Sequence, residues 1–322
     1  MEVAWNIICS VALLFTMMIP GVLMKKCKLS VDGLGKGISN LVLYIAQPAL
    51  IFLAYVRPFA REILVNAIYV LVFSIIVHGI FSVVALMSYK KAPDRMRRML
   101  RFATIFSNAA FMGIPLIKSV LGAEATIYAS IYNIVFNLFV WSLGVYICTG
   151  NGDKSVTEND GEEIKVNISP LKVLYHPVTV AAILGIVFFM LPIENYIPKL
   201  VMEALENLGN LVAPLSMIII GLRLAEMDVR GILKDKHMYL FLALRHFVLP
   251  LIALGLVNLV GLLLPVSNLV KMVIVILAAT PTATSTTMFA EKYDCDATYA
   301  SRLVAISTLI SIVTMPIILL FA

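Results

Sequence analysis

Long apolar runs separated by short polar connections make up almost all of this 322-residue chain. A helix needs about 20 apolar residues to cross roughly 30 Å of hydrocarbon, and ten runs approach that length. They cover residues 4–24, 37–56, 64–88, 101–120, 124–148, 176–192, 203–224, 238–263, 269–290 and 297–321. The pattern predicts an all-α integral membrane protein with ten transmembrane helices embedded in a lipid bilayer.

Composition agrees with that prediction and excludes several classes. The chain is 61% hydrophobic and 14% charged, whereas soluble domains carry about 25% charged residues. Its net charge of +6 does not indicate nucleic acid, because basic residues in so apolar a chain set membrane topology and no nucleic-acid motif accompanies them. The four cysteines have no metal-site spacing, so we expect neither a metal nor another cofactor.

The distribution of lysine and arginine predicts the orientation. With the amino terminus outside, the connections facing the cytoplasm hold nineteen of the 25 basic residues and the outer connections hold five. Cytoplasmic connections are enriched in lysine and arginine. We therefore expect a multi-pass protein of the plasma membrane with both termini extracytoplasmic.

A polar, acidic segment over residues 150–172 divides the chain into halves of five predicted helices, 1–149 and 173–322. We expect this segment to be a cytoplasmic linker. An odd number of helices in each half places the second half upside down relative to the first, as in inverted-repeat transporters. Pro115 and Pro281 are 166 residues apart, and the same offset joins Pro48 to Pro214.

The prolines of the fourth and ninth helices predict that both helices are broken where they cross. Proline removes an amide donor and disrupts the preceding turn, and broken backbone survives in a membrane only when buried in protein or lining a wet cavity. Gly113 lies beside Pro115. Past Pro281, the predicted binding residues are Thr282, Thr284 and Ser285. The amino ends of the half-helices carry partial positive charge, so the expected ligand is an anion.

Other polar residues inside the apolar runs are further candidates. Asn108 precedes Pro115 by about two helical turns, and Asn137 lies in the fifth run. Each amide is suited either to substrate binding or to hydrogen bonding between helices. Arg245 and His78 are candidates for charge compensation or coupling, since ionisable residues at membrane depth mark pathways or partners. No aspartate or glutamate lies deep in a run, which leaves proton coupling, sodium coupling and uniport open.

Several segments resemble the auxin efflux carrier family, which includes bacterial permeases related to plant auxin transporters. The resemblance rests on residues 108–122 (NAAFMGIPLIKSVLG), residues 289–293 (FAEKY), the Arg245 and Pro250 pair, and residues 314–316 (TMP). It implies ten helices in two inverted repeats with crossing helices four and nine. It also implies that Asn108 and the Pro115 and Pro281 crossovers contact an anionic substrate.

The same resemblance bears on the substrate. Asn137 falls near a polar position that is glutamine in plant members, whereas Ile51 replaces a serine of the plant carriers. This departure favours small dicarboxylates such as malonate or malate over auxin.

The predicted function is transport of small organic anions by alternating access. The alternative is a membrane-embedded sensor that binds the same anion without moving it. An intramembrane enzyme is not expected, because GxSxG and HExxH motifs are absent and the four histidines form no cluster. A homodimer is compatible with the sequence.

Overall fold

The computed structural model describes residues 2–31, 33–150, 155–157, 163–165, 174–191, 197–225 and 235–321, and almost all of them are helical. Seven helices are long and apolar enough to cross a membrane: Ile8–Lys26, Leu34–Tyr55, Arg61–Met87, Ala125–Cys148, Lys199–Ala225, Lys236–Gly261 and Ala297–Leu319. Shorter apolar helices cover Ala109–Leu121, Pro177–Met190 and Asn268–Ala279. The prediction of a helical, multi-pass membrane protein is confirmed at this level.

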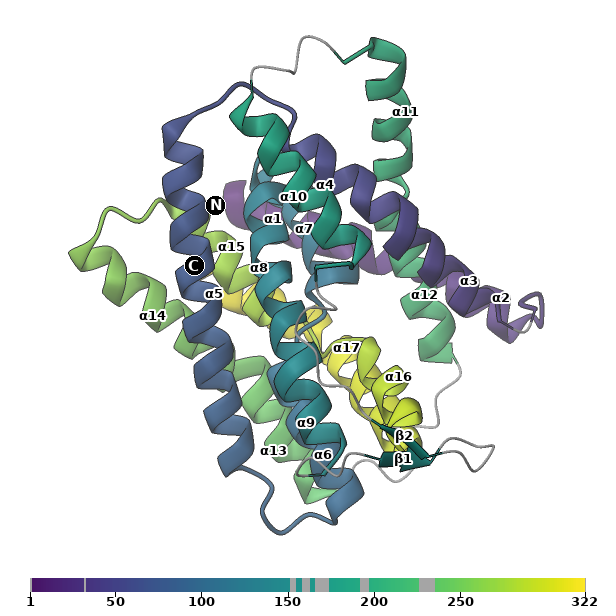
Figure 1. The fold of residues 1–322 in the computed structure, drawn as a ribbon. Coiled ribbons are helices and arrows are strands. Elements are labelled where there is room, and N and C mark those ends of the chain that lie inside the picture. The colour runs from purple at the N-terminus through teal and green to yellow at the C-terminus, as the bar shows by residue number, and fades with distance from the viewer. Residues whose placement is uncertain are drawn as a thin grey trace.

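The first half consists of α-helices, labelled in Figure 1, that are interrupted by π-helical segments, here named η. The elements are α1 (Glu2–Thr16), α2 (Ile19–Lys26), α3 (Leu34–Leu41), η1 (Val42–Ala46), α4 (Gln47–Tyr55), α5 (Arg61–Met87), α6 (Asp94–Ile105), η2 (Ala109–Gly113), α7 (Ile114–Leu121), α8 (Ala125–Phe139), η3 (Val140–Gly144) and α9 (Val145–Cys148).

The second half is also mainly helical in its described residues. Its elements are α10 (Pro177–Met190), α11 (Lys199–Asn210), α12 (Val212–Ala225), α13 (Lys236–Ala243), η7 (Leu244–Val248), α14 (Leu249–Leu263), α15 (Asn268–Ala279), α16 (Ser285–Lys292) and α17 (Ala297–Leu319). Inside the predicted linker, β1 (Ser155–Thr157) and β2 (Glu163–Lys165) pair antiparallel. The fold class is thus helical with one small hairpin, and the remaining residues of the linker lie outside the described residues.

Two breaks in helices meet in the interior. One separates α6 from η2 and the other separates α15 from α16. Ser107 and Thr282 form an antiparallel bridge there. Asn108 N–H donates to Pro281 O at 2.7 Å, and Ala283 N–H donates to Phe106 O at 2.9 Å. Because no water is available in hydrocarbon to satisfy free backbone groups, each break supplies hydrogen-bond partners for the other.

The predicted position of the first break is wrong. The chain leaves helical geometry at residues 106–108, and Pro115 lies buried in the first turn of α7. Proline is tolerated in a first turn, and the π-helical segment η2 directly before it accommodates the ring without ending the helix. Pro281 does lie within the second break, between Ala279 and Ser285.

The helices pack in two groups. In one group α10 and α11 pack on α4, while α12 packs on α2 and α3. In the other group α5 packs on α6 and α8, α14 packs on α15, and α17 packs on α6, α15 and α16. The crossing of the two breaks lies in the second group. Of the first group, α12 contacts η2 of the second group, and α4 and α10 contact α8.

Candidate functional site

A cavity of about 250 Å³ lies beside the crossing of the two broken helices. Its walls come from both halves of the chain and from both packing groups. The polar residues that line it are Gln47, Ser107, Asn108, Asn133, Asn137, His176, Thr284, Ser285 and Lys292. Most of the accessible wall is apolar, and these polar groups are set into it. No aspartate or glutamate lines the cavity among the described residues, so its lysine has no compensating acid there.

Four buried amide and hydroxyl atoms of the cavity lining have no hydrogen-bond partner among the described residues, and neither does His176 Nδ1. The four are Asn108 Nδ2, Ser107 Oγ, Asn133 Oδ1 and Gln47 Oε1. Nearly all buried polar side-chain atoms in proteins are hydrogen-bonded, since desolvating one without a partner is costly. A group of four around one cavity therefore indicates that a ligand or solvent occupies the space between them.

Helix amino termini add to the polar character of the cavity. Asn108 and Ala110 lie at the start of η2, and Thr284 and Ser285 lie at the start of α16; all four line the cavity. First-turn amides lack intrahelical acceptors and give a helix amino end its partial positive charge. Both half-helices thus present to the cavity the end that favours an anion.

Asn137 lines the cavity, but its amide group is engaged locally. Its Nδ2 donates to Asn133 O at 2.8 Å, one turn earlier in α8. Asn133 is 1% exposed and keeps its own Oδ1 free. Of the two asparagines of the fifth helix, Asn133 therefore has the free amide oxygen.

The remaining crossover candidates build the crossing rather than line the cavity. A Cβ on Gly113 would lie 2.5 Å from Leu277 Cδ2, so glycine allows η2 to approach α15 closely. Thr282 Oγ1 donates to Ala103 O at 2.8 Å, and its N–H donates to Ser307 Oγ. Pro281 accepts from Asn108, as described above, and Pro115 packs within α7.

Arg245 lies at the crossing, fully buried and outside the cavity lining. Its guanidinium donates to Thr104 O at 3.2 Å, to Ala278 O at 2.9 Å and to Thr280 O at 2.6 Å. These carbonyls belong to the carboxyl ends of α6 and α15, where a cation is favourable. The arginine thus joins the two broken helices.

His78 lies away from the cavity in the middle of α5. Its Nδ1 lies 2.8 Å from Ser74 O, and aromatic rings of α8 including Tyr132 pack around it. Its Nε2 has no partner among the described residues. The structure gives this histidine a packed, apolar environment.

Sequence reasoning missed part of the lining. Gln47 and Ser107 are single polar residues within apolar runs, the same signal that identified Asn108. Lys292 was assigned to a cytoplasmic connection because it ends its helix, although its side chain returns to the cavity. Trp141 and His176 gave no sequence signal for a site.

Two broken helices that cross inside an apolar helical chain, beside a polar cavity, are typical of membrane proteins that handle a small molecule. The sequence model of a protein family described as "Membrane transport protein" matches residues 6–319 of this chain. The chain therefore belongs to this family of membrane transport proteins, the auxin efflux carrier family indicated by its motifs.

Two archaeal relatives are also transporters by name. An uncharacterized transporter of Methanothermobacter thermautotrophicus is 25% identical over 218 residues, which cover 68% of this chain and 66% of the relative, just under two thirds of its length. The uncharacterized transporter MJ1031 of Methanocaldococcus jannaschii is 23% identical over 288 residues, 87% of each chain.

Proposed function

We propose that this protein transports small organic anions, such as carboxylates, across the plasma membrane by alternating access. The observation that supports it best is the cavity at the crossing, which combines two helix amino termini, unpartnered amide and hydroxyl groups and a lysine, with no acidic residue in the described lining. Such a cavity favours a carboxylate over a cation or a neutral apolar molecule.

The proposed architecture is ten membrane-crossing segments in two inverted five-helix repeats, residues 1–149 and 173–322. Seven long helices, two broken segments and the apolar helix α10 make up ten such segments. The antiparallel bridge between Ser107 and Thr282 supports the inversion, because equivalent segments of an inverted repeat run in opposite directions where they meet.

The two packing groups suggest how the carrier moves. The proposed transporting unit contains α5–α9 and α13–α17, and the proposed scaffold contains α1–α4 and α10–α12. Within the scaffold, α1 lies at the boundary, because it packs on α7 and α17 as well as on α12. A carrier of this kind rocks or slides one unit against the other around a site that stays intact. The unpartnered side chains come mainly from the transporting unit, and Gln47 comes from the scaffold.

The structure represents the inward-facing state in this proposal. The cavity extends to His176 and Lys292, which lie at the cytoplasmic ends of their helices under the predicted orientation. On the opposite side, Tyr55 and Ser130 hydroxyls bond at 2.8 Å and Arg57 pairs with Glu124 at 3.0 Å. These contacts join the scaffold to the transporting unit and close the outer path.

Asn108→Ala tests the site. We expect carboxylate flux into proteoliposomes to fall at least about tenfold, because a hydrogen bond to a charged group contributes roughly 1.5–3 kcal/mol. The matched control is Asn258→Ala, at an exposed position of α14. Wild-type flux in the Asn108 variant would refute the site assignment.

Flux also separates the candidate functions. A counterflow screen of mono- and dicarboxylates, with and without sodium and a pH gradient, measures transport and its coupling together. Carboxylate binding without flux in every condition would favour the sensor over the carrier.

A further inference from the structure

Lys292 is the cation of the cavity, and aromatic rings hold its side chain. It is the last residue of α16. Its Nζ lies 5.7 Å from the centre of the Trp141 ring and 5.7 Å from that of Tyr293, distances typical of cation–π contacts. Trp141 also lines the cavity, so the ammonium group is held against its wall.

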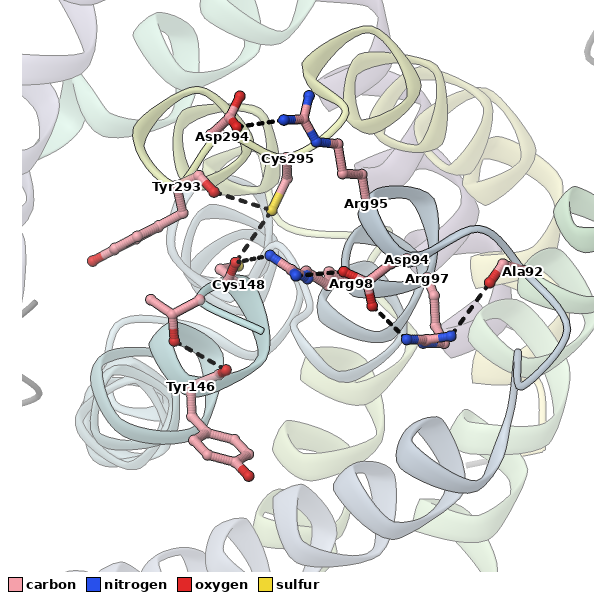
Figure 2. Close-up of polar contacts among 11 residues, drawn as sticks. Ala92, Asp94, Arg95, Arg97, Arg98, Tyr146, Cys148, Tyr293, Asp294 and Cys295 are labelled. Atoms are coloured by element: carbon pink, nitrogen blue, oxygen red, sulfur yellow. Dashed lines mark hydrogen bonds and ion pairs between the residues drawn. The ribbon is translucent and has the colours of Figure 1, made fainter. Parts of the chain in front are cut away.

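The acidic neighbours of Lys292 in the sequence are directed elsewhere. Glu291 lines a different cavity, between α16 and the α2–α3 connection. Asp294 pairs with Arg95 at 2.6 Å. Figure 2 shows this ion pair beside the contact of Cys295 Sγ with Cys148 O, which fixes the chain that follows Lys292 to α9. Among the described residues, Lys292 therefore has aromatic partners and no carboxylate partner.

The cavity has two unlike ends. Ser285 and Lys292, the first and last residues of α16, both line it, so it extends along about 10 Å of helix at 1.5 Å per residue. The amides near Asn108 and the helix amino termini lie at the crossing, and the ammonium group lies at the other end. One carboxylate is too small to contact both ends. A short carbon chain with a carboxylate at each end, at about 1.5 Å per bond, reaches both when the flexible lysine side chain extends toward it.

We infer that Lys292 determines specificity for substrates with two carboxylates. One carboxylate binds Asn108 and Ser107 at the crossing, and the second forms an ion pair with Lys292. The ammonium group of Lys292 moves away from the Trp141 ring when this ion pair forms. This inference rests on the proposed function, and it adds a residue that distinguishes dicarboxylates from monocarboxylates.

The test compares malonate and succinate with propionate as probes. The chain has two tryptophans, Trp5 and Trp141, so in a Trp5→Phe background the emission of Trp141 reports movement of Lys292. Binding is followed by this emission and transport by counterflow in proteoliposomes. We expect the dicarboxylates to bind about tenfold to a hundredfold more tightly than propionate, as expected for one additional charged hydrogen bond.

The variants assign that preference to the lysine. Lys292→Met should lose the dicarboxylate preference, because it weakens malonate and succinate binding far more than propionate binding. Lys292→Arg should retain the preference. The control is Lys199→Met, at an exposed position of α11. Helix α11 lies at the top of Figure 1, far from α16.

The outcomes separate this inference from the function on which it rests. Equal affinity for mono- and dicarboxylates in the wild type, or an unchanged preference in Lys292→Met, overturns the role of Lys292 and leaves the anion carrier in place. Failure of every carboxylate to bind or move overturns both.

Discussion

Arg245 shows how a single charge is stabilised in the membrane interior. It is the one Lys, Arg, Asp or Glu side chain that is fully buried among the described residues. Burying a charge is costly unless hydrogen bonds replace water, and here three carbonyls freed by the two breaks accept from it. The arginine and the breaks therefore depend on each other.

Arg245→Met is expected to destabilise the protein. The change leaves three buried carbonyls without a donor, at about 1–3 kcal/mol each, and should lower the melting temperature in detergent by roughly 6 °C or more. The exposed Arg61, at the start of α5, gives the control Arg61→Met. Similar melting temperatures for the two variants would contradict the role of Arg245 in the crossing.

The candidate site was predictable where one residue alone carried the signal. Asn108 is an amide in an apolar run, and its place beside the cavity follows that prediction. Asn137 was the predicted residue of the fifth helix rather than Asn133, because sequence does not show which amide hydrogen-bonds within its own helix. Lys292 was missed because its position at a helix end says nothing about the direction of its side chain.

Three prolines of the described residues follow π-helical segments inside a helix that continues. Pro48, Pro115 and Pro250 each lie two residues after the end of such a segment. A π-turn shifts the hydrogen-bond register and so absorbs the missing amide of the proline. Proline alone was therefore a poor guide to the break of the fourth helix.

The two breaks meet where Ser107 pairs with Thr282, and Pro115 does not take part in this contact. Neither proline nor glycine occurs in Phe106-Ser107-Asn108. That break persists because the other break satisfies its backbone groups, which is a tertiary effect that no local pattern contains. The helical, multi-pass architecture followed from the hydrophobic runs, whereas the position of this break did not.

Two glycines set the closest approach of helices in the scaffold. A Cβ on Gly221 in α12 would lie 2.1 Å from Met18 O, and one on Gly21 in α2 would lie 2.2 Å from Ile218 O. Small residues permit such backbone contact between membrane helices. Since backbone atoms cannot rotate away, any side chain at these positions must separate α2 from α12.

Gly221→Ala should therefore lower the melting temperature by several degrees, with an overpacking cost of about 1–3 kcal/mol. Gly79→Ala in α5 is the matched control, because nothing lies within 4 Å of its Cβ position and alanine favours a helix by about 1 kcal/mol. The packing of α2 on α12 would need revision if both variants melted alike.

At the scale of the whole molecule, the proposed closure of the outer path rests on weak contacts between the proposed scaffold and the proposed transporting unit. Arg57 and Glu124 are partly exposed, and Lys118 Nζ donates to Asn210 Oδ1 at 2.8 Å. Exposed pairs contribute only about 0–1 kcal/mol each. Contacts of that size close the outer path while leaving the outward-facing state within thermal reach.

Replacing both Arg57 and Lys118 by glutamine should raise the fraction of time for which the outer path is open. In a background with the native cysteines changed to serine, Ser130→Cys places a thiol at a buried position next to Tyr55. The labelling rate of this thiol measures access from outside. We expect a membrane-impermeant maleimide to label it about fivefold faster in Arg57→Gln/Lys118→Gln, a shift of about 1 kcal/mol. The exposed Arg61→Gln is the control, and identical rates in all three proteins would show that these contacts do not close the path.

The charge of Arg245 has an electrical consequence for the proposed cycle. The transporting unit contains this charge, and an inside-negative voltage draws a positive charge inward with about 2.3 kcal/mol per 100 mV across the full field. The empty unit is therefore pulled toward the cytoplasm, whereas a bound anion offsets this charge and weakens the pull on the loaded unit. The membrane potential then resets the empty carrier after each release outside, so an energised cell would drive anions outward without any coupling ion.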